Sequence, residues 1–231
     1  MPIGLICNLA AVFAGGIAGG VLKAKLSQRM KEVLPLILGI CAMVIGINSI
    51  IKVHSLPPVI IAVIIGTVFG EVIHLEDKLK RGFGAIIKVM PIKDKNVDME
   101  QYLTVAVLFC ASGFGYFGVL TEGMTGDPSI LLSKSVMDFF TGMIFATALG
   151  FSVSIIVIPQ AVIFTALYLA AGALSYVVND VMLANFISCG GVLTLASGFR
   201  VAKIKQVPIG SMIPALILVM PLSYYLSLIG I

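Results

Sequence analysis

Two opposite charges stand inside a hydrophobic stretch of this chain. Residues 125–140 read TGDPSILLSKSVMDFF and place Lys134 and Asp138 four positions apart. Residues at i and i+4 share one face of a helix, so the two side chains can meet. In a helix that begins near Asp127 they would lie roughly 9 and 15 Å along the axis. We expect Asp138 to be an ion or proton ligand, with Lys134 as its partner or as a contact for an anion.

The element that carries this pair must be surrounded by lipid. The chain has 231 residues, of which 59% are hydrophobic and 11% are charged. A soluble domain of this length carries roughly 25% charged residues. Apolar stretches of about 20 residues recur along the chain, which is the length that a helix needs to cross a bilayer. The sequence therefore predicts an all-α, polytopic transmembrane helix bundle that forms a single domain over residues 1–231.

The basic residues suggest how the spans are oriented. We predict about eight spans, at approximately 3–22, 33–51, 56–75, 101–120, 130–156, 159–178, 181–198 and 208–229. Lys and Arg favour short cytoplasmic loops. Of the 15 basic residues, all except Lys52 and Lys134 lie in or beside the segments that follow the first, third and seventh spans. With about eight spans these segments share one side, and both termini face outward.

Further polar residues can join the charged pair or lie on the way to it. An ionised group near the bilayer centre costs about 2.5–3.5 kcal/mol, so the pair must face the bundle or a wet cavity. Asn8 in the first span and Asn185 in the seventh are candidate members of the site. Glu122 and Asp127 would form its outer approach, and Asp127 before Pro128 is typical of a helix start. Alternatively, the pair is a tolerated intrahelical salt bridge, and the amides only link neighbouring helices.

Glycine and proline positions predict an inverted repeat. The second and third spans resemble the fifth and sixth, and by the charge pattern the two pairs of spans cross in opposite directions, as in many secondary transporters. The matched positions agree only within a few residues: Gly39, Gly46, Pro58 and Gly70 with Gly142, Gly150, Pro159 and Gly172. The alternative is coincidence, because glycine is frequent in such helices. Pro214 and Pro221 remove internal hydrogen bonds, so the last span should be kinked or broken.

Two surfaces suggest partners. Residues 76–97 form a basic amphipathic segment, which we place on the cytoplasmic membrane surface in contact with lipid; the alternative is a solvated linker. Small residues recur at four-residue spacing in Gly15–Gly19, Gly16–Gly20 and Gly66–Gly70. Such faces let helices approach closely. They predict packing within the chain or a homo-oligomer.

Three stretches resemble one family. TEGMTGDPSILLSKSVMDFF, GTVFGEVIHLEDKL and NLAAVFAGGIAGG are similar to the uncharacterised bacterial membrane family called domain of unknown function 554. The core of the resemblance is Gly126, Asp127, Ser129, Lys134 and Asp138. It covers essentially the whole chain and implies the bacterial inner membrane. The family is commonly labelled a possible transport protein, and the resemblance implies no substrate and no catalytic residue.

These observations favour a small-solute or ion transporter, or a channel-like protein, with a polar site near mid-membrane on the fifth span. The alternative is a structural or regulatory membrane subunit that transports nothing, in which the charged pair only packs. Whether the pair reaches water distinguishes the two. No cluster of metal ligands and no nucleophile beside a base is visible. We therefore expect no enzyme activity, no cofactor or metal, and no nucleic-acid partner.

Overall fold

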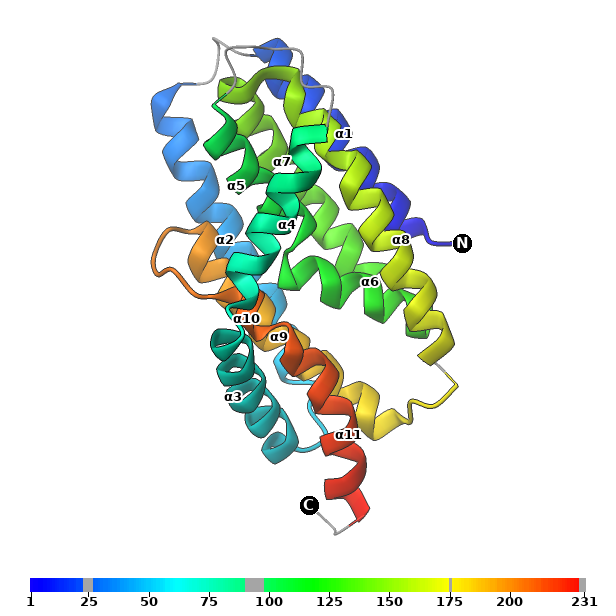
Figure 1. The fold of residues 1–231 in the computed structure, drawn as a ribbon. Coiled ribbons are helices and arrows are strands. Elements are labelled where there is room, and N and C mark those ends of the chain that lie inside the picture. The colour runs from blue at the N-terminus through cyan, green and yellow to red at the C-terminus, as the bar shows by residue number, and fades with distance from the viewer. Residues whose placement is uncertain (23–26, 90–97, 175, 229–231) are drawn as a thin grey trace.

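The computed structural model describes residues 1–22, 27–89, 98–174 and 176–228. Every regular element in these ranges is helical, as the composition predicts (Figure 1). The elements are α1 (Ile3–Leu22), α2 (Gln28–Ile50), α3 (Leu56–Val72), α4 (Leu75–Val89), α5 (Met99–Cys110), α6 (Gly113–Thr125), α7 (Ser129–Leu149), the 3-10 helix η1 (Gly150–Ile156), α8 (Val157–Leu174), α9 (Asp180–Val201), α10 (Ile209–Met212) and α11 (Pro214–Leu228).

Several helices are long and apolar enough to cross a membrane. Six stretches of the described chain qualify, namely Ile3–Leu22, Gln28–Ile50, Met99–Thr125, Ser129–Leu174, Asp180–Val201 and Ile209–Leu228. A pair bent by 58°, Leu56–Val72 with Leu75–Ala85, would raise the number to seven. The predicted count of about eight, the inverted repeat and the outward termini stay predictions.

The 46-residue stretch Ser129–Leu174 turns back on itself. Gln160 of α8 and Asp138 of α7 both bond Asn8, and Phe164 lies with Lys134 beside Gly115. Asp138 of α7 therefore lies near Gln160 of α8, and the earlier residue Lys134 lies near the later residue Phe164. The two helices are thus antiparallel. The predicted span 130–156 is wrong at its end, because α7 stops at Leu149. Gly150 follows with φ 67° and ψ −156°, a conformation open mainly to glycine.

Glycine faces join α1 to α7. These helices run parallel, because Gly4 lies beside Leu131, Gly15 beside Phe139 and Gly19 beside Met143. A Cβ atom on Gly15 would lie 2.3 Å from the Phe139 carbonyl oxygen, and one on Gly19 would lie 2.1 Å from that of Met143. Only glycine permits so close an approach. This packing places the first turns of α1 against the part of α7 that carries the charged pair.

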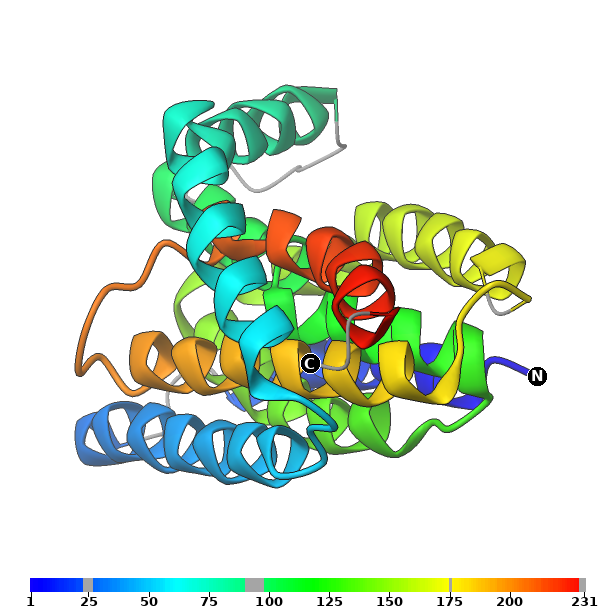
Figure 2. The same cartoon turned by 90° about the horizontal axis from the view of Figure 1, so that it is seen from below.

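The other two prominent helix pairs are antiparallel. Gly39 and Gly46 of α2 pack against Gly198 and Gly191 of α9, and Figure 2 shows these two helices side by side. Gly66 of α3 packs against Ala215 of α11, and Gly70 packs against Ser211 of α10. The small-residue faces named in the sequence are thus occupied within the chain. A homo-oligomer stays a prediction, but these faces are not free to form it.

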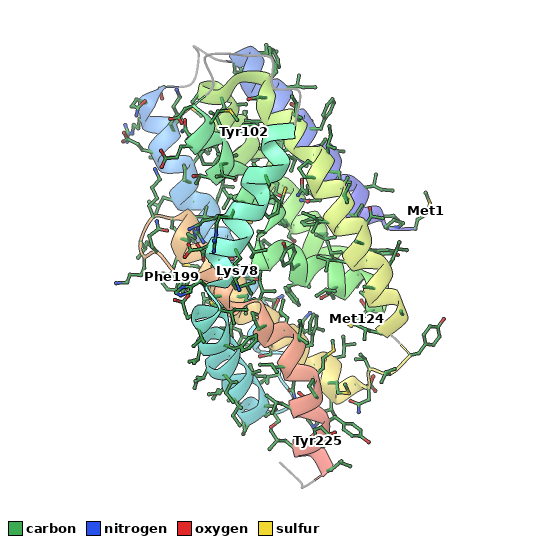
Figure 3. All side chains as sticks on the ribbon, viewed as in Figure 1. Met1, Lys78, Tyr102, Met124, Phe199 and Tyr225 are labelled. Carbon is green, nitrogen blue, oxygen red and sulfur yellow. The ribbon has the colours of Figure 1, made fainter. Side chains whose placement is uncertain are left out.

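Two breaks shape the region around the pair. The predicted span 101–120 is not continuous, because α5 ends at Cys110 and α6 begins at Gly113, with the Ser112 hydroxyl accepting the N–H of Gly115 at 3.2 Å. Tyr102 of α5, labelled in Figure 3, donates its hydroxyl to the Ser152 carbonyl of η1 at 3.1 Å. The last span is also broken, between α10 and α11, where Pro214 predicts an interruption.

The amphipathic segment forms a helix only as far as the structure describes it. α4 covers Leu75–Val89, and its first turn carries Glu76 and Asp77. Residues 90–97 of the predicted segment lie outside the described residues. Phe83 is 4% exposed and packs into the core. The location of this segment on the membrane surface stays a prediction.

Candidate functional site

The charged pair lies on the inner face of α7. Lys134 Nζ donates to Asp138 Oδ2, and the two residues are 2% and 8% exposed. Val136, between them, is 61% exposed and points away from the bundle. The i, i+4 spacing and the cost of a charge in lipid predict this orientation. Burial of two charges without pairing would be unfavourable, so each side chain serves as the counter-ion of the other.

Two amides extend the pair into a buried network. Asn8 Nδ2 of α1 donates to Asp138 Oδ2 at 2.8 Å, and Gln160 Nε2 of α8 donates to Asn8 Oδ1 at 2.9 Å. The same Gln160 nitrogen lies 3.5 Å from the Phe109 carbonyl oxygen. The Asp138 carboxylate needs a hydrogen-bond donor, so Asn8 must direct its Nδ2 toward it. Gln160 then lies beside two acceptors, Asn8 Oδ1 and the Phe109 carbonyl oxygen, so it must direct its Nε2 toward them. The hydrogen-bond network therefore determines the orientation of both amides.

The two oxygens of the Asp138 carboxylate differ in their surroundings. Oδ2 accepts from both Lys134 and Asn8. Within the described part of the chain, Oδ1 accepts no hydrogen bond from the protein, yet it is not among the enclosed unpaired atoms, which are Gln160 Oε1 and Ser188 Oγ. Asp138 also lines a cavity. Oδ1 is thus the oxygen that can meet water, a proton or an ion.

A cavity of about 60 Å³ adjoins the pair. A water molecule in the liquid occupies about 30 Å³, so the space suits a few waters or an ion of few atoms. It lies at the α5–α6 break, between α7, α9, α4 and α10. Its polar lining consists of Glu76, Ser112, Lys134, Asp138, Thr141, Ser197 and Arg200. The cavity therefore has one ion pair on α7 and a second pair contributed by α4 and α9.

Glu76 and Arg200 form that second pair, with 3.1 Å between Glu76 Oε1 and an Arg200 guanidinium nitrogen. Glu76 also accepts from Lys80 Nζ at 3.1 Å and from the N–H of Gly210 at 3.3 Å. The carboxylate thus joins α4, α9 and the start of α10. Sequence reasoning missed this pair because both residues read as ordinary loop charges. No local spacing links positions so far apart, so no sequence signal was available.

A second cavity, of about 260 Å³, lies beside the first and shares part of its lining. Both are lined by Leu108, Thr141, Arg200 and Val201. The second cavity, here called the basic vestibule, also carries Lys31 and Lys203, and no carboxylate is among its described lining residues. It lies where α2 begins and α9 ends. On the predicted topology this is the cytoplasmic end.

The side of the charged pair that faces α6 and α8 is tightly packed. Leu131 and Phe164 are completely buried. A Cβ atom on Gly115 would lie 2.7 Å from Phe164 Cζ and 3.0 Å from Lys134 Cε. These side chains pack closely on this side of Lys134. The two cavities instead share Thr141 of α7 and Arg200 of α9.

A larger cavity, of about 840 Å³, lies between α6, α8, α9 and α11. Met124 and Tyr225 are part of its lining and are labelled in Figure 3. No charged side chain is among its described lining residues. It does not share the chemistry of the charged pair.

Of the other residues named in the sequence, Asn8 joins the pair, whereas Glu122 does not form an outer approach. Glu122 is 2% exposed, and its carboxylate accepts the N–H groups of Gly4 at 2.7 Å and Leu5 at 3.0 Å. It thereby caps the start of α1, where a negative charge meets the positive end of the helix dipole. The expectation of an exposed approach residue was wrong because the α6 end packs against the α1 start.

Asp127 is exposed and lies two residues before α7, which begins at Ser129 with Pro128 at the N-cap position where the sequence predicts Asp127. Its Oδ1 accepts from the N–H of Ser129 at 2.9 Å and from the Ser129 hydroxyl at 2.5 Å. The hydroxyl bond, followed by the backbone bond, lowers the pKa of Asp127 below its ordinary value. Its observed contacts are local to the helix start.

Asn185 does not meet the pair. Its Oδ1 accepts the N–H groups of His54 at 3.1 Å and Ser55 at 2.9 Å, and its Nδ2 donates to Ser223 Oγ at 3.1 Å. Asn185 thus caps the start of α3 and links α9 to α11. This is a structural role, in agreement with the alternative that the amides only link neighbouring helices.

Comparisons with known proteins cover nearly the whole chain. The sequence model of a family described as "Protein of unknown function (DUF554)" matches residues 3–224. "Uncharacterized protein YqgA" of Escherichia coli (strain K12) is 40% identical over 227 residues, which cover 96% of this chain and 97% of that protein. "Uncharacterized membrane protein YdfK" of Bacillus subtilis (strain 168) is 26% identical over 222 residues, or 93% of each chain. No solved structure matches.

Proposed function

The chain belongs to the DUF554 family, as the resemblance of its sequence implied, and we propose that it transports a small solute or ion through a polar site at Asp138. Asp138 binds the ion or proton, Lys134 sets the charge of the site, and Asn8 with Gln160 hold the carboxylate in place. The apolar helices support a membrane protein, and the name of the Bacillus subtilis relative describes that relative as one. We assign it to the bacterial inner membrane.

The helix directions support the predicted topology. Because α7 and α8 are antiparallel, the stretch Ser129–Leu174 supplies two spans, and the bent pair α3–α4 supplies another. Together with the remaining stretches this makes about eight spans. In this arrangement α1, α3, α7 and α9 run inward. The basic segments then lie in the cytoplasm and both termini lie outside.

The observation that carries the proposal is the cavity beside the pair. A salt bridge that only packs needs no water, whereas a transport site must be reached by its substrate. The cavity is lined by both Asp138 and Arg200, and Arg200 and Thr141 also line the adjacent basic vestibule. The side of the pair that faces α6 and α8 is closed by Leu131 and Phe164. This is the arrangement of a transporter that is open to the cytoplasm, and transport then requires a second state that opens between α6, α7 and α8.

Access to the cavity is tested by cysteine labelling. Thr141 lines both cavities, so Thr141→Cys, in a background without the four native cysteines, should react with a membrane-impermeant thiol reagent from the cytoplasmic side only. Val136→Cys is the matched control, because it lies on the same helix and faces lipid. A thiol in lipid does not ionise and should not react. If Thr141→Cys is inert from both sides, the pair is dry and the packing alternative is favoured.

Transport is tested directly with proteoliposomes. Ion and pH gradients are imposed one at a time, and internal pH and membrane potential are followed with dyes. Asp138→Asn should abolish proton-coupled flux while the purified protein keeps its helical content. Wild-type flux in this variant would refute the role given to Asp138.

A further inference from the structure

The charges around the inner cavity balance. Lys134 and Arg200 contribute two positive charges, and Asp138 and Glu76 contribute two negative charges. A cation that entered this site would have to compete with Lys134 for the Asp138 carboxylate. An anion would have to compete with the carboxylate for Lys134. Neither ion can bind strongly while the pair is intact, so binding requires that one charge be removed.

Protonation of Asp138 removes a charge most easily. Both oxygens of Glu76 are occupied, Oε1 by Arg200 and Lys80 and Oε2 by the N–H of Gly210. Asp138 differs because both of its donors converge on Oδ2, while Oδ1 accepts no hydrogen bond from the described residues and Asp138 lines the cavity. A proton on Oδ1 leaves the bonds to Asn8 and Lys134 in place. Hydrogen bonds to the ionised form oppose protonation, so the less bonded oxygen accepts the proton.

Once Asp138 is neutral, Lys134 lacks a counter-ion. A buried ammonium without a partner is strongly unfavourable. Lys134 is 2% exposed, and no second acceptor for Nζ is present among the described residues. We propose that the cavity binds a small monovalent anion at Lys134 together with a proton on Asp138. This proposal rests on the proposed transport site and names the class of its substrate.

The entrance to the cavity favours an anion over a cation. The basic vestibule is lined by Lys31 and Lys203 besides Arg200, which is paired with Glu76, and no carboxylate is among its described lining residues. A cleft with charges of one sign concentrates ions of the opposite sign. The inner cavity, of about 60 Å³, has room for an anion of one to a few heavy atoms. A larger divalent anion would exceed both the space and the single compensating charge.

The remaining titratable groups near the pair are few. From α5, the buried Cys110 thiol donates to the Ile156 carbonyl oxygen at 3.9 Å. From α4 and α9, Glu76 and Arg200 face the same cavity. The nearby polar side chains of α1 and α8, Asn8 and Gln160, are amides and do not titrate. Asp138 is therefore the group whose protonation changes the affinity of the cavity for the anion.

The proposed step conserves charge. One proton moves from water to Asp138 Oδ1, and one anion replaces water beside Lys134 Nζ. The net charge of the cavity is unchanged, so the loaded site can cross between two states without moving charge through lipid. Linkage makes the effect reciprocal, because the anion raises proton affinity by the same factor by which the proton raises anion affinity.

Calorimetry on the purified full chain in detergent tests this binding. Nitrate, chloride and formate are titrated in buffers of different ionisation enthalpy, which gives the number of protons taken up per anion. We expect about one proton per nitrate at neutral pH. The apparent Kd should rise about tenfold for each pH unit over the range in which Asp138 is ionised in the empty protein. Sulfate should not bind.

The variants identify the groups. Asp138→Asn should bind nitrate without proton uptake and with a Kd that does not vary with pH. Lys134→Met should not bind it. Asp77→Asn, an exposed carboxylate beside Glu76, is the matched control and should behave as wild type. The wild-type proton count does not depend on whether any variant folds.

Distinct results overturn the two proposals. If none of the three anions binds wild type with proton uptake, or if Glu76→Gln rather than Asp138→Asn removes the uptake, the anion site is refuted. Ion-coupled flux in the liposome assay would still support transport in that case. If nitrate binds as described but no imposed gradient drives flux, transport is refuted and the anion site remains.

Discussion

Removal of one member of the buried pair should destabilise the protein far more than removal of both. Loss of one partner leaves an uncompensated charge, which costs about 3–5 kcal/mol. Lys134→Met leaves Asp138 hydrogen-bonded to the Asn8 amide and beside the cavity, so its cost should lie near the lower figure. Asp138→Leu leaves Lys134 almost fully enclosed and without another acceptor, so its cost should lie near the upper figure.

The double variant Lys134→Met with Asp138→Leu contains no stranded charge. It leaves the Asn8 Nδ2 donor unpaired, which costs about 1–3 kcal/mol. The new apolar packing offsets part of this cost, because replacing a buried ion pair by apolar groups is often neutral or stabilising. We therefore expect the double variant to lie within about 2 kcal/mol of wild type, several kcal/mol better than the sum of the single variants.

Unfolding in mixed micelles with increasing SDS measures these differences. The chain has no tryptophan, so far-UV circular dichroism is the suitable signal. Thr141→Ser, which keeps a hydroxyl in the cavity, is a control that should change little. Single variants that each cost under about 1 kcal/mol and add up in the double variant would refute the reasoning, because an exposed pair behaves in that way.

Four further substitutions test the packing and the helix starts. Gly19→Ala should weaken or prevent folding, because its Cβ would lie 2.1 Å from the Met143 carbonyl oxygen. Gly82→Ala has no atom within 4 Å of the new Cβ and should stabilise α4 by about 0.5–1 kcal/mol. Thermal unfolding of the two variants measures both effects. Glu122→Gln should loosen the α1 start, seen as faster hydrogen exchange at the first turn, and unchanged exchange would contradict the cap. Asp127→Ala should cost about 1 kcal/mol at neutral pH. Because the folded-state pKa of Asp127 is lowered, this difference should be present above the ordinary carboxyl range and disappear as pH falls through the folded value, which unfolding measured at several pH values can check.

Local patterns were sufficient for the helices and for the orientation of the pair. Helix α1 occupies Ile3–Leu22, where the sequence predicts its first span, and the last span breaks before Pro214. Lys134 and Asp138 share a face because four residues make about one turn. The cost of a charge in lipid then leaves only the inward orientation. These conclusions need no knowledge of any other part of the chain.

Local sequence patterns do not distinguish the roles of two asparagines, Asn8 and Asn185. Asn8 and Asn185 each precede a glycine-rich run. Asn8 donates to Asp138, which lies 130 positions away, whereas Asn185 caps α3 through His54, which lies 131 positions away. Periodicity describes one helix at a time, so it cannot tell which neighbour an amide will meet.

The sequence alone thus determined the helical membrane class, most of the helix positions and the charged pair on one helix face, because each depends on neighbouring residues or on total composition. Only the tertiary structure decided that Glu122 caps α1, that Glu76 joins Arg200 and that Asp138 lines a cavity beside the basic vestibule. Each of these depends on helices that meet at a particular angle and register. Such contacts are set by the close approach of glycine faces over the whole bundle, and no short segment encodes them.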